Sequence, residues 1–506
     1  MLENYRMVVF DIIKKIQYGR KRIVLNYDEV TPENFLEVFS KAKPIFDKNK
    51  VDCEYLIDVF LGNQDILTRP APSTSEINNQ VVVNYALPIT REIVGYTFGS
   101  PTEIIQKNTD NKEQVQKVSD IFDDCNSYSL DMTVGIYASI CGFGYFITLP
   151  SPDISEDNIP DKPLLIDSID PRNAFVVTSS SVGHKQIMSC MIECDSDGNN
   201  IKYHCFTDKY KFIIDTTKPK DSLNQNAYSF DVSDNPIGKD PITMVENSVF
   251  LTGDWEQALS VLNAINLIAS DSLNDIEGSI RSLLIILGSE FEDADIKLKD
   301  IKKKRLLTLA NPQGSSGGAL DAKFISPTID SNSIQNIREY LEDARNVITG
   351  IPDRSANSSG GDTGTAVLNR DGWTDIEIVA RLKELFFKKA KKQQIGIALS
   401  VLKKASVIDD SINTIDIDVQ IGRHTTDNLS TKASAFATLV STGELATIDC
   451  LEFSNLTNRT NEVIERGKAY KEEKRKESLE YMKEEAALTG SGLSPTDADV
   501  AKDETE

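Results

Sequence analysis

The longest regular pattern of apolar and polar positions begins just after Asp254. From there, apolar residues recur every three or four positions: Trp255, Leu259, Leu262, Ile265, Ala269, Leu273, Ile276 and Ile280. This spacing predicts a helix with one apolar face about 40 Å long, because an α-helix rises about 1.5 Å per residue. Asp254 and Gln257 form a capping-box pattern that indicates where the helix starts. Such a helix is longer than an ordinary domain requires.

A second helical pattern has the seven-residue repeat of a narrow packing seam. Its apolar positions are Ile334, Ile337, Leu341, Ala344 and Ile348. Helices with this repeat pack against neighbouring helices along one side. The pattern stops at Gly350 and Pro352, and a Gly/Ser/Asp-rich stretch follows. We therefore expect a stiff rod that ends in a mobile polar loop, which suits the lining of a passage better than a reaction centre.

A compact α/β insertion separates these two helical patterns. It contains strand-like runs at Leu283–Leu287 and Leu306–Ala310, a short amphipathic helix at Glu292–Lys303, and a Gly/Ser-rich loop at Asn311–Gly318. The two rods can therefore lie side by side with the small module at their far end.

The C-terminal part of the chain again reads as mainly helical. Thr374 and Glu377 form a capping box that opens or restarts a helix continuing to about Ala405. A strand-like run follows at residues 415–421, and residues 427–485 are helical in pattern. The tail from Thr489 is rich in Gly, Ser and Asp, so we expect it to be disordered.

The N-terminal half reads as mixed α/β after a short helical beginning. Thr31-Pro32-Glu33 is a helix start with Pro at the first helical position. Residues 115–141 have a helical pattern, and Phe143–Leu149 is strand-like. Strand-like runs at residues 187–194 and 201–206 flank a polar turn cluster, which predicts a β-hairpin. The fold class that these patterns favour is α+β, mainly helical.

Length and composition describe a globular chain. It has 506 residues, of which 40% are hydrophobic, enough for about three domains of ~150 residues. No stretch approaches the ~18 apolar residues of a membrane span, and Met1–Gly19 mixes charges into its apolar positions. We expect neither a span nor a secretory signal. Seven cysteines at irregular spacings favour free thiols in a reducing compartment, so the chain is expected to stay in the cytosol where it is made.

The net charge of −23 and the pI near 4.7 argue against a protein that grips DNA, because phosphate binding needs clustered Lys and Arg. The charge is compatible with a conduit through which DNA slides, since an attractive wall would hold the polymer by counterion release. An acidic balance can equally serve only to keep a protein soluble.

The Gly-rich stretches do not read as nucleotide sites. Asn311–Gly318 and Ser358–Thr365 both lack the Gly-Lys-Ser/Thr ending that supplies a phosphate-binding lysine and a magnesium-binding hydroxyl. We therefore do not expect ATP hydrolysis.

The spacing of the potential ligands also gives little support for a zinc site or for a carboxylate site that binds two metal ions. Cys190, Cys194, His204 and Cys205 have the chemistry of zinc ligands, but adjacent His204 and Cys205 face opposite sides of a strand. Asp416 and Asp418 face one side of a strand, as in a two-metal nuclease. With 78 acidic residues such pairs arise by chance.

Two basic stretches have two interpretations each. Lys299–Arg305 could contact DNA or an acidic partner, or it could be a solvated helix end favoured by the helix dipole. A second group forms either the wet face of the long helix or a cationic belt: Lys388, Lys389, Lys391 and Lys392.

The order of these segments resembles the portal proteins of tailed phages, in particular those of long-tailed phages of Gram-positive hosts. The helix, the GIPD sequence ending at Asp353, the Gly/Ser/Thr loop and the following long helix resemble the stem helix, tunnel loop and kinked core helix of that family. Asn78–Tyr85 and Gly95–Pro101 resemble its NN-x-VVVNY and GY-x-FG-x-P segments, and Ala435–Leu445 resembles its helix, Gly and helix pattern. The similarity covers roughly residues 50 to 475, and the hydrophilic tail after Tyr481 departs from it.

The resemblance implies a portal fold with an α/β wing, long stem helices, a small α/β clip and a helical crown. It implies the following division: N-terminal helical segment 1–50, wing 51–250, stem helix 251–280, clip 281–330, stem helix 331–352, tunnel loop 353–364, long core helix 365–405, crown 406–488 and disordered acidic tail 489–506. In the family the long helix runs on from the loop, which would make Gly372 a kink; the sequence leaves kink or break open.

The resemblance also implies the candidate functional residues. For the tunnel loop that surrounds DNA these are Asn357, Ser358, Ser359, Gly360, Gly361, Asp362, Thr363 and Gly364. The stem packing residues are Ile334, Ile337, Leu341, Ala344 and Ile348, and the basic residues of the clip that would dock partners are Lys302, Lys303, Lys304 and Arg305.

The resemblance implies a structural protein of the virion, assembled in the cytoplasm of a bacterial host. The expected assembly is a ring of 12 copies at one capsid vertex, with double-stranded DNA passing through it during packaging and ejection. Expected partners are the terminase, the head-tail adaptor, and the major capsid and scaffolding proteins, with no membrane. We expect no enzymatic activity, cofactor or metal. The alternatives are a metal-dependent nuclease or nucleotide hydrolase of the packaging machinery, and a host-derived helical scaffold that binds only protein.

Overall fold

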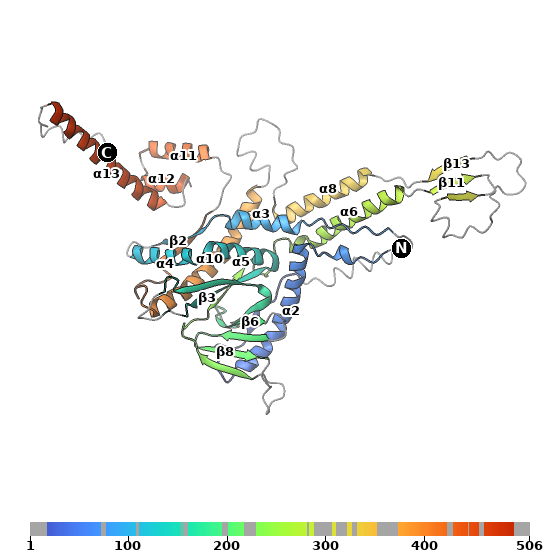
Figure 1. The fold of residues 1–506 in the computed structure, drawn as a ribbon, viewed down its shortest axis with the longest axis horizontal. Coiled ribbons are helices and arrows are strands. Elements are labelled where there is room, and N and C mark those ends of the chain that lie inside the picture. Colours follow the sequence, from blue (N-terminus) through green and yellow to red (C-terminus); the bar gives the residue numbers. More distant parts are fainter. Residues whose placement is uncertain are drawn as a thin grey trace, which may run out of the picture. The chain divides into compact units, whose positions relative to one another are not determined.

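A computed structural model shows an α+β chain that is mainly helical, as the sequence predicts (Figure 1). The structure describes residues 18–71, 77–107, 111–152, 154, 160–194, 201–216, 229–280, 283–287, 306–309, 321–325, 331–351, 373–422, 429–443, 445–454 and 460–489. The chain divides into two compact units, Met1–His424 and Thr425–Glu506, and each is described by itself.

The larger sheet of the first unit has six strands in the order β1-β5-β6-β7-β8-β9. Their bounds are β1 Ile23–Leu25, β5 Ala174–Ser179, β6 Gln186–Cys194, β7 Ile201–Phe206, β8 Tyr210–Asp215 and β9 Phe230–Asp234. Strand β1 is parallel to β5, and the other neighbours are antiparallel. Strands β6 and β7 confirm the predicted hairpin, with Cys194 opposite Ile201.

Helix α2 (Phe35–Leu61) packs on this sheet through its aromatic residues. The ring of Phe35 stacks on that of Phe212 on β8 at 4.1 Å, and Phe46 lies 5.0 Å from Phe175 on β5. The helix begins four residues after the predicted start at Thr31, and it continues past residue 50, where the sequence suggested a domain boundary. The expected N-terminal segment 1–50 and the expected wing therefore share one helix.

A second sheet of three antiparallel strands has the order β10-β3-β4. Its strands are β3 (Phe143–Pro150), which confirms the predicted strand, β4 (Leu164–Ile169) and β10 (Ile242–Glu246). Helices α5 (Ser127–Cys141) and α10 (Trp373–Lys404) both pack against it.

The single helical pattern at residues 115–141 is two helices in the structure. Helix α4 (Lys112–Asp124) ends before Asn126, which has a φ of 55° in the left-handed region, and α5 starts at Ser127. The helical pattern is confirmed, and the break within it lies at Asn126, a residue type that tolerates the left-handed conformation.

The strand-like run at residues 415–421 is confirmed by β14 (Ile417–Ile421), which pairs antiparallel with β2 (Thr102–Gln106). This pairing places β14 in the first unit, although the expected crown begins at residue 406. Isoleucines and valines of α4, α10 and β14 form a shared core beside it.

Two long helices, α6 (Leu259–Ile280) and α8 (Ser331–Thr349), lie side by side (Figure 1). The chain between them includes a sheet in which β11 (Leu283–Leu287) is the central strand, parallel to β12 (Leu306–Leu309) and antiparallel to β13 (Asp321–Ile325). Both predicted strands are confirmed, while β13 was not predicted. The predicted helix at residues 292–303 and the loop at 311–318 lie outside the described residues.

The helix start predicted by the capping box at Asp254 and Gln257 was wrong. Helix α6 begins at Leu259, after a 3₁₀ turn at Glu256–Ala258, because the side chain of Asp254 bonds to distant parts of the fold instead of capping the helix. The helix predicted from Thr374 to about Ala405 is confirmed by α10, which spans Trp373–Lys404.

The second unit consists of three helices, α11 (Leu429–Ser441), α12 (Thr447–Ser454) and α13 (Thr460–Thr489), which confirm the helical pattern of residues 427–485. Helix α12 packs against both of the others. Helix α13 includes Thr489, and the tail beyond it lies outside the described residues.

Candidate functional site: the paired long helices and their attachment

The seven-residue repeat of α8 is only partly covered within one chain. Ile334, Leu341 and Ala344 are half-buried, whereas 52% of the surface of Ile337 is exposed and Ile348 is exposed as well. Helix α6 is the long helix that packs along α8. The seam therefore leaves apolar surface that this chain alone does not bury.

Helix α6 changes its surroundings along its length. At its start Leu259, Leu262 and Ile265 are buried in the core that also contains Phe143 and Ile242. Towards its end Leu273 and Ile276 of the same apolar stripe are exposed. The predicted stripe is thus embedded at one end and leaves the core at the other.

An extended segment, residues 77–85, runs along α6 and is held by polar side chains of that helix. Asn274 Oδ1 accepts from Asn79 N at 2.7 Å, and Ser270 Oγ accepts from Val81 N at 2.9 Å. Asn266 Oδ1 accepts from Val83 N at 2.8 Å. We call these three hydrogen bonds from backbone amides to side chains of α6 the ladder.

The ladder works because two periodicities match. Four residues of α-helix advance about 6 Å, and two residues of extended chain advance about 6.6 Å, so every fourth helical position meets every second extended position. Ser270 and Asn266 are fully buried, where an unpaired amide would cost about 1–3 kcal/mol. The ladder therefore fixes the segment against α6 in one register.

The same segment also contacts α8 at its last residue. Tyr85 Oη donates to Glu342 Oε1 at 2.9 Å, and the guanidinium of Arg345 lies 3.8 Å from the Tyr85 ring centroid. Residues 79–85 thus contact both long helices and tie them together.

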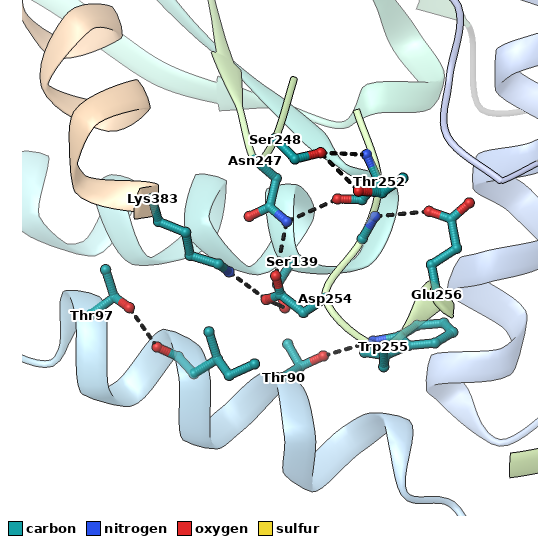
Figure 2. A network of polar contacts seen from close by, with 12 residues as sticks. Thr90, Thr97, Ser139, Asn247, Ser248, Thr252, Asp254, Trp255, Glu256 and Lys383 are labelled. Atoms are coloured by element: carbon teal, nitrogen blue, oxygen red, sulfur yellow. Dashed lines mark hydrogen bonds and ion pairs between the residues drawn. The ribbon is translucent and has the colours of Figure 1, made fainter. Parts of the chain in front are cut away.

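The start of α6 is attached through a buried polar network around Asp254 (Figure 2). Asp254 Oδ2 accepts from Ser139 Oγ at 2.6 Å, and Oδ1 accepts from Asn247 Nδ2 at 2.8 Å. Lys383 of α10 forms an ion pair with Asp254 in which both side chains are almost fully buried. Burial lowers the pKa of the Lys383 ammonium, and the neighbouring Asp254 carboxylate raises it in partial compensation.

Trp255 and Glu256, both labelled in Figure 2, complete the attachment. Trp255 Nε1 donates to Thr90 Oγ1 of α3 (Ala86–Phe98) at 3.0 Å. Glu256 accepts from Gly253 N at 2.8 Å and from Gly19 N at 2.7 Å, and it forms a buried ion pair with Arg20. The loop before α6 therefore joins α3, α5, α10 and the N-terminal segment.

Glycine is required at position 253 by close packing. A Cβ there would lie 2.3 Å from the carbonyl oxygen of Ile140, which is part of α5. The adjacent Asp254 N donates to Ser139 O at 2.8 Å, so the loop backbone lies directly on the helix.

The lysines of α10 do not form one wet face or a cationic belt. Lys391 is buried, pairs with Asp131 Oδ1 at 2.6 Å, and lies about 5 Å from two phenylalanine ring centroids. Lys388 pairs with Glu384 on its own helix, and Lys392 pairs with Asp418 at 2.7 Å. Both interpretations were wrong for Lys391, because its partner lies 260 residues away in the sequence.

The residues considered for a two-metal carboxylate site and for a zinc site are not brought together for those roles. Asp418 is engaged by Lys392, and Asp416 Oδ2 accepts from Asn413 N at 2.9 Å. Cys190 and Cys205 lie opposite each other and are buried, while His204 contacts Glu193 at 2.8 Å. Within the described part of the chain, no three or more His, Cys, Asp or Glu side chains are grouped to hold a metal ion. Of the described helices, none has the length and apolar character to cross a membrane.

Two sets of predicted residues have no described structure. The candidate loop at Asn357–Gly364 and the basic residues Lys302–Arg305 lie outside the described residues.

The sequence analysis missed the ladder residues of α6. Asn266, Ser270 and Asn274 are spaced by four on an otherwise apolar helix. This spacing is a sequence signal, because small polar side chains on one line of a buried helix need a polar partner beside it.

Comparison with known proteins gives one family match. A family model described as "Phage portal protein, SPP1 Gp6-like" matches residues 40–478. Among solved structures, one titled "Neck of empty GTA particle computed with C6 symmetry" is similar at 11% sequence identity and a TM-score of 0.45, covering 80% of this chain and 94% of that chain. No curated protein matches the chain.

Proposed function

Because the chain belongs to the SPP1 Gp6-like family of phage portal proteins, a component of the virus particle, we propose that it forms a ring at one capsid vertex through which DNA enters and leaves. The expected ring has 12 copies. The observation that supports a ring is the apolar surface left exposed on the paired helices at Leu273, Ile276 and Ile337. Neighbouring copies related by rotation would bury it and close the ring.

In this proposal each part has a task. Helices α6 and α8 are the stem and line the middle of the channel, and residues 353–364 form its constriction. The ladder and the Asp254 network hold the stem to the wing, so the stem helices keep one position while DNA moves past them. The net charge of −23 supports a passage to which DNA does not adhere.

The sheet of β11, β12 and β13 belongs to the clip, which we propose as the docking face for the terminase and later for the head-tail adaptor. Lys302, Lys303, Lys304 and Arg305 of the same insertion would contact acidic surfaces of those partners. The crown, residues 406–488, would face the interior of the head, with scaffolding and major capsid proteins around the ring.

The stem assignment can be tested with Ile337→Asp, because Ile337 is exposed in one chain and its substitution spares the core. Sedimentation velocity at micromolar concentration should show rings for the natural chain and monomers for the variant, with equal helix content by circular dichroism. Val51→Asp, at another exposed apolar position on α2, is the matched control and should form rings. Rings of Ile337→Asp would remove α8 from the contact between copies, and a natural chain that stays monomeric would contradict the ring itself.

A further inference from the structure

The first half of α10 has apolar residues on two opposite sides. Its inner side is buried in the cores formed with α3, β3 and β10: Ile376, Ala380, Phe387 and Ala390. Ile378, Leu382 and Leu385 are 53%, 59% and 68% exposed. At 3.6 residues per turn, these three positions fall on one stripe roughly opposite the buried side. We call Ile378, Leu382 and Leu385 the outer stripe.

Two ion pairs lie along one flank of this half of α10. Arg381 pairs with Glu377 at 2.7 Å, and Lys388 pairs with Glu384 at 2.7 Å. Both are pairs between successive turns, so they leave the outer stripe uncharged. A helix that is apolar on opposite sides is typical of one that is buried in a larger assembly.

The outer stripe adjoins the apolar surface at the end of α8. A Cβ on Gly350, which follows α8, would lie 3.0 Å from Val379 Cγ2 of α10. Val347 and Ile348 are exposed one turn before this contact, and Ile378 is the neighbour of Val379. Together these side chains expose roughly a few hundred Å² of apolar surface, the size that marks an interaction site on a soluble protein.

A second copy of this chain is the occupant that fits the outer stripe. DNA does not fit the stripe, because its apolar side chains cannot neutralise phosphates and the cations of Arg381 and Lys388 beside it are paired with glutamates. Copies that each carry a charge of −23 repel one another, so their association needs apolar contact to offset this repulsion. The stripe also adjoins the end of the stem helix, whose apolar surface is proposed to face neighbouring copies.

We infer that the outer stripe of α10 is a contact between neighbouring copies in the ring, in addition to the stem. This inference rests on the proposed ring. It adds α10 to the stem helices as a contact between copies, so each copy would contact its neighbour through two separate surfaces. The partner surface on the neighbour is a different patch, since rings are built from head-to-tail contacts.

Leu385→Asp tests the inference, with Leu61→Asp as the matched control. Leu61 is 66% exposed at the end of α2, almost the same as Leu385. In sedimentation velocity at micromolar protein, the natural chain and Leu61→Asp should form rings, and Leu385→Asp should shift to monomers or small open assemblies. Rings formed equally by Leu385→Asp would overturn the inference and leave the ring proposal intact, whereas a natural chain without rings would overturn both.

A cross-linking experiment guards against a variant that simply fails to fold. p-Benzoylphenylalanine placed at position 385 of assembled rings should give a covalent dimer on irradiation, and the same residue at position 61 should not. A dimer band of equal strength at both positions, or at neither, would contradict a contact at the outer stripe.

Discussion

Lys383 of α10 and Asp254, five residues before α6, form a buried ion pair that joins α10 to the loop from which α6 starts. Both partners are needed for stability, because removal of one leaves the charge of the other buried without a counter-charge. Asp254 keeps bonds to Ser139 and Asn247, which hold the carboxylate in place but supply no positive charge.

Lys383→Met should therefore lower the free energy of unfolding by about 3–5 kcal/mol. Denaturant unfolding followed by tryptophan fluorescence measures this directly, since Trp255 is buried next to Asp254. Lys388→Met is the control on the same helix, where a half-exposed pair with Glu384 predicts a change of about 0.5 kcal/mol or less. Equal losses in the two variants would show that the buried pair does not anchor the start of α6.

The ladder predicts a local effect at Ser270. Ser270→Ala removes the acceptor of the Val81 amide, so hydrogen exchange of residues 79–83 should accelerate several-fold, and stability should fall by about 1 kcal/mol. Ser272→Ala is a close control, because both serines donate to the carbonyl four residues earlier but Ser272 is bonded to its own helix through Ile268. Unchanged exchange in Ser270→Ala would mean that the segment is held by other contacts.

Asp240 predicts a pH dependence of the free energy of unfolding. Burial raises its pKa to about 7, although hydrogen bonds from Ser189 and from the Ile242 amide favour the carboxylate. Because the folded pKa is higher than the unfolded one, the stabilisation is complete below about pH 4 and is lost as the pH rises through about 7.

Thermal unfolding between pH 5 and pH 8 tests this prediction. The natural chain should lose stability with rising pH relative to Asp240→Asn, by up to a few kcal/mol. Asp234→Asn, at an exposed carboxylate on β9, should follow the natural chain. Parallel curves for the natural chain and Asp240→Asn would contradict the raised pKa.

The candidate loop should matter for DNA and not for folding. Replacement of residues 358–361 by alanines should change the melting temperature little, because a polar, Gly-rich stretch has few packing contacts to lose. The same change alters the bulk of the proposed channel constriction, so particles should contain less DNA or retain it poorly. Full-length genomes packaged at normal yield by loop variants of different bulk would remove residues 353–364 from the channel.

Elements with a strong internal repeat could be predicted from the sequence. Helix α8 and the hairpin of β6 and β7 were predicted from patterns of neighbouring residues alone. The structure has both elements at the predicted positions. The resemblance to portal proteins is likewise confirmed by the family match over residues 40–478.

Features that depend on distant partners could not be predicted. Asp254 has the spacing of a helix cap, yet its carboxylate is bonded by residues 115 and 129 positions away. From the sequence, Lys391 is expected to be a solvated charge, and only the structure shows that it is buried beside Asp131. The ladder also requires residues 79–83 to meet α6, almost 200 residues later in the chain.

Electron micrographs of the purified chain, viewed down the symmetry axis, test the central claim most directly. Class averages should show closed rings of constant subunit number with an open centre, and Ile337→Asp should abolish them. Averages that show only monomers, or filaments that never close, would contradict a portal ring.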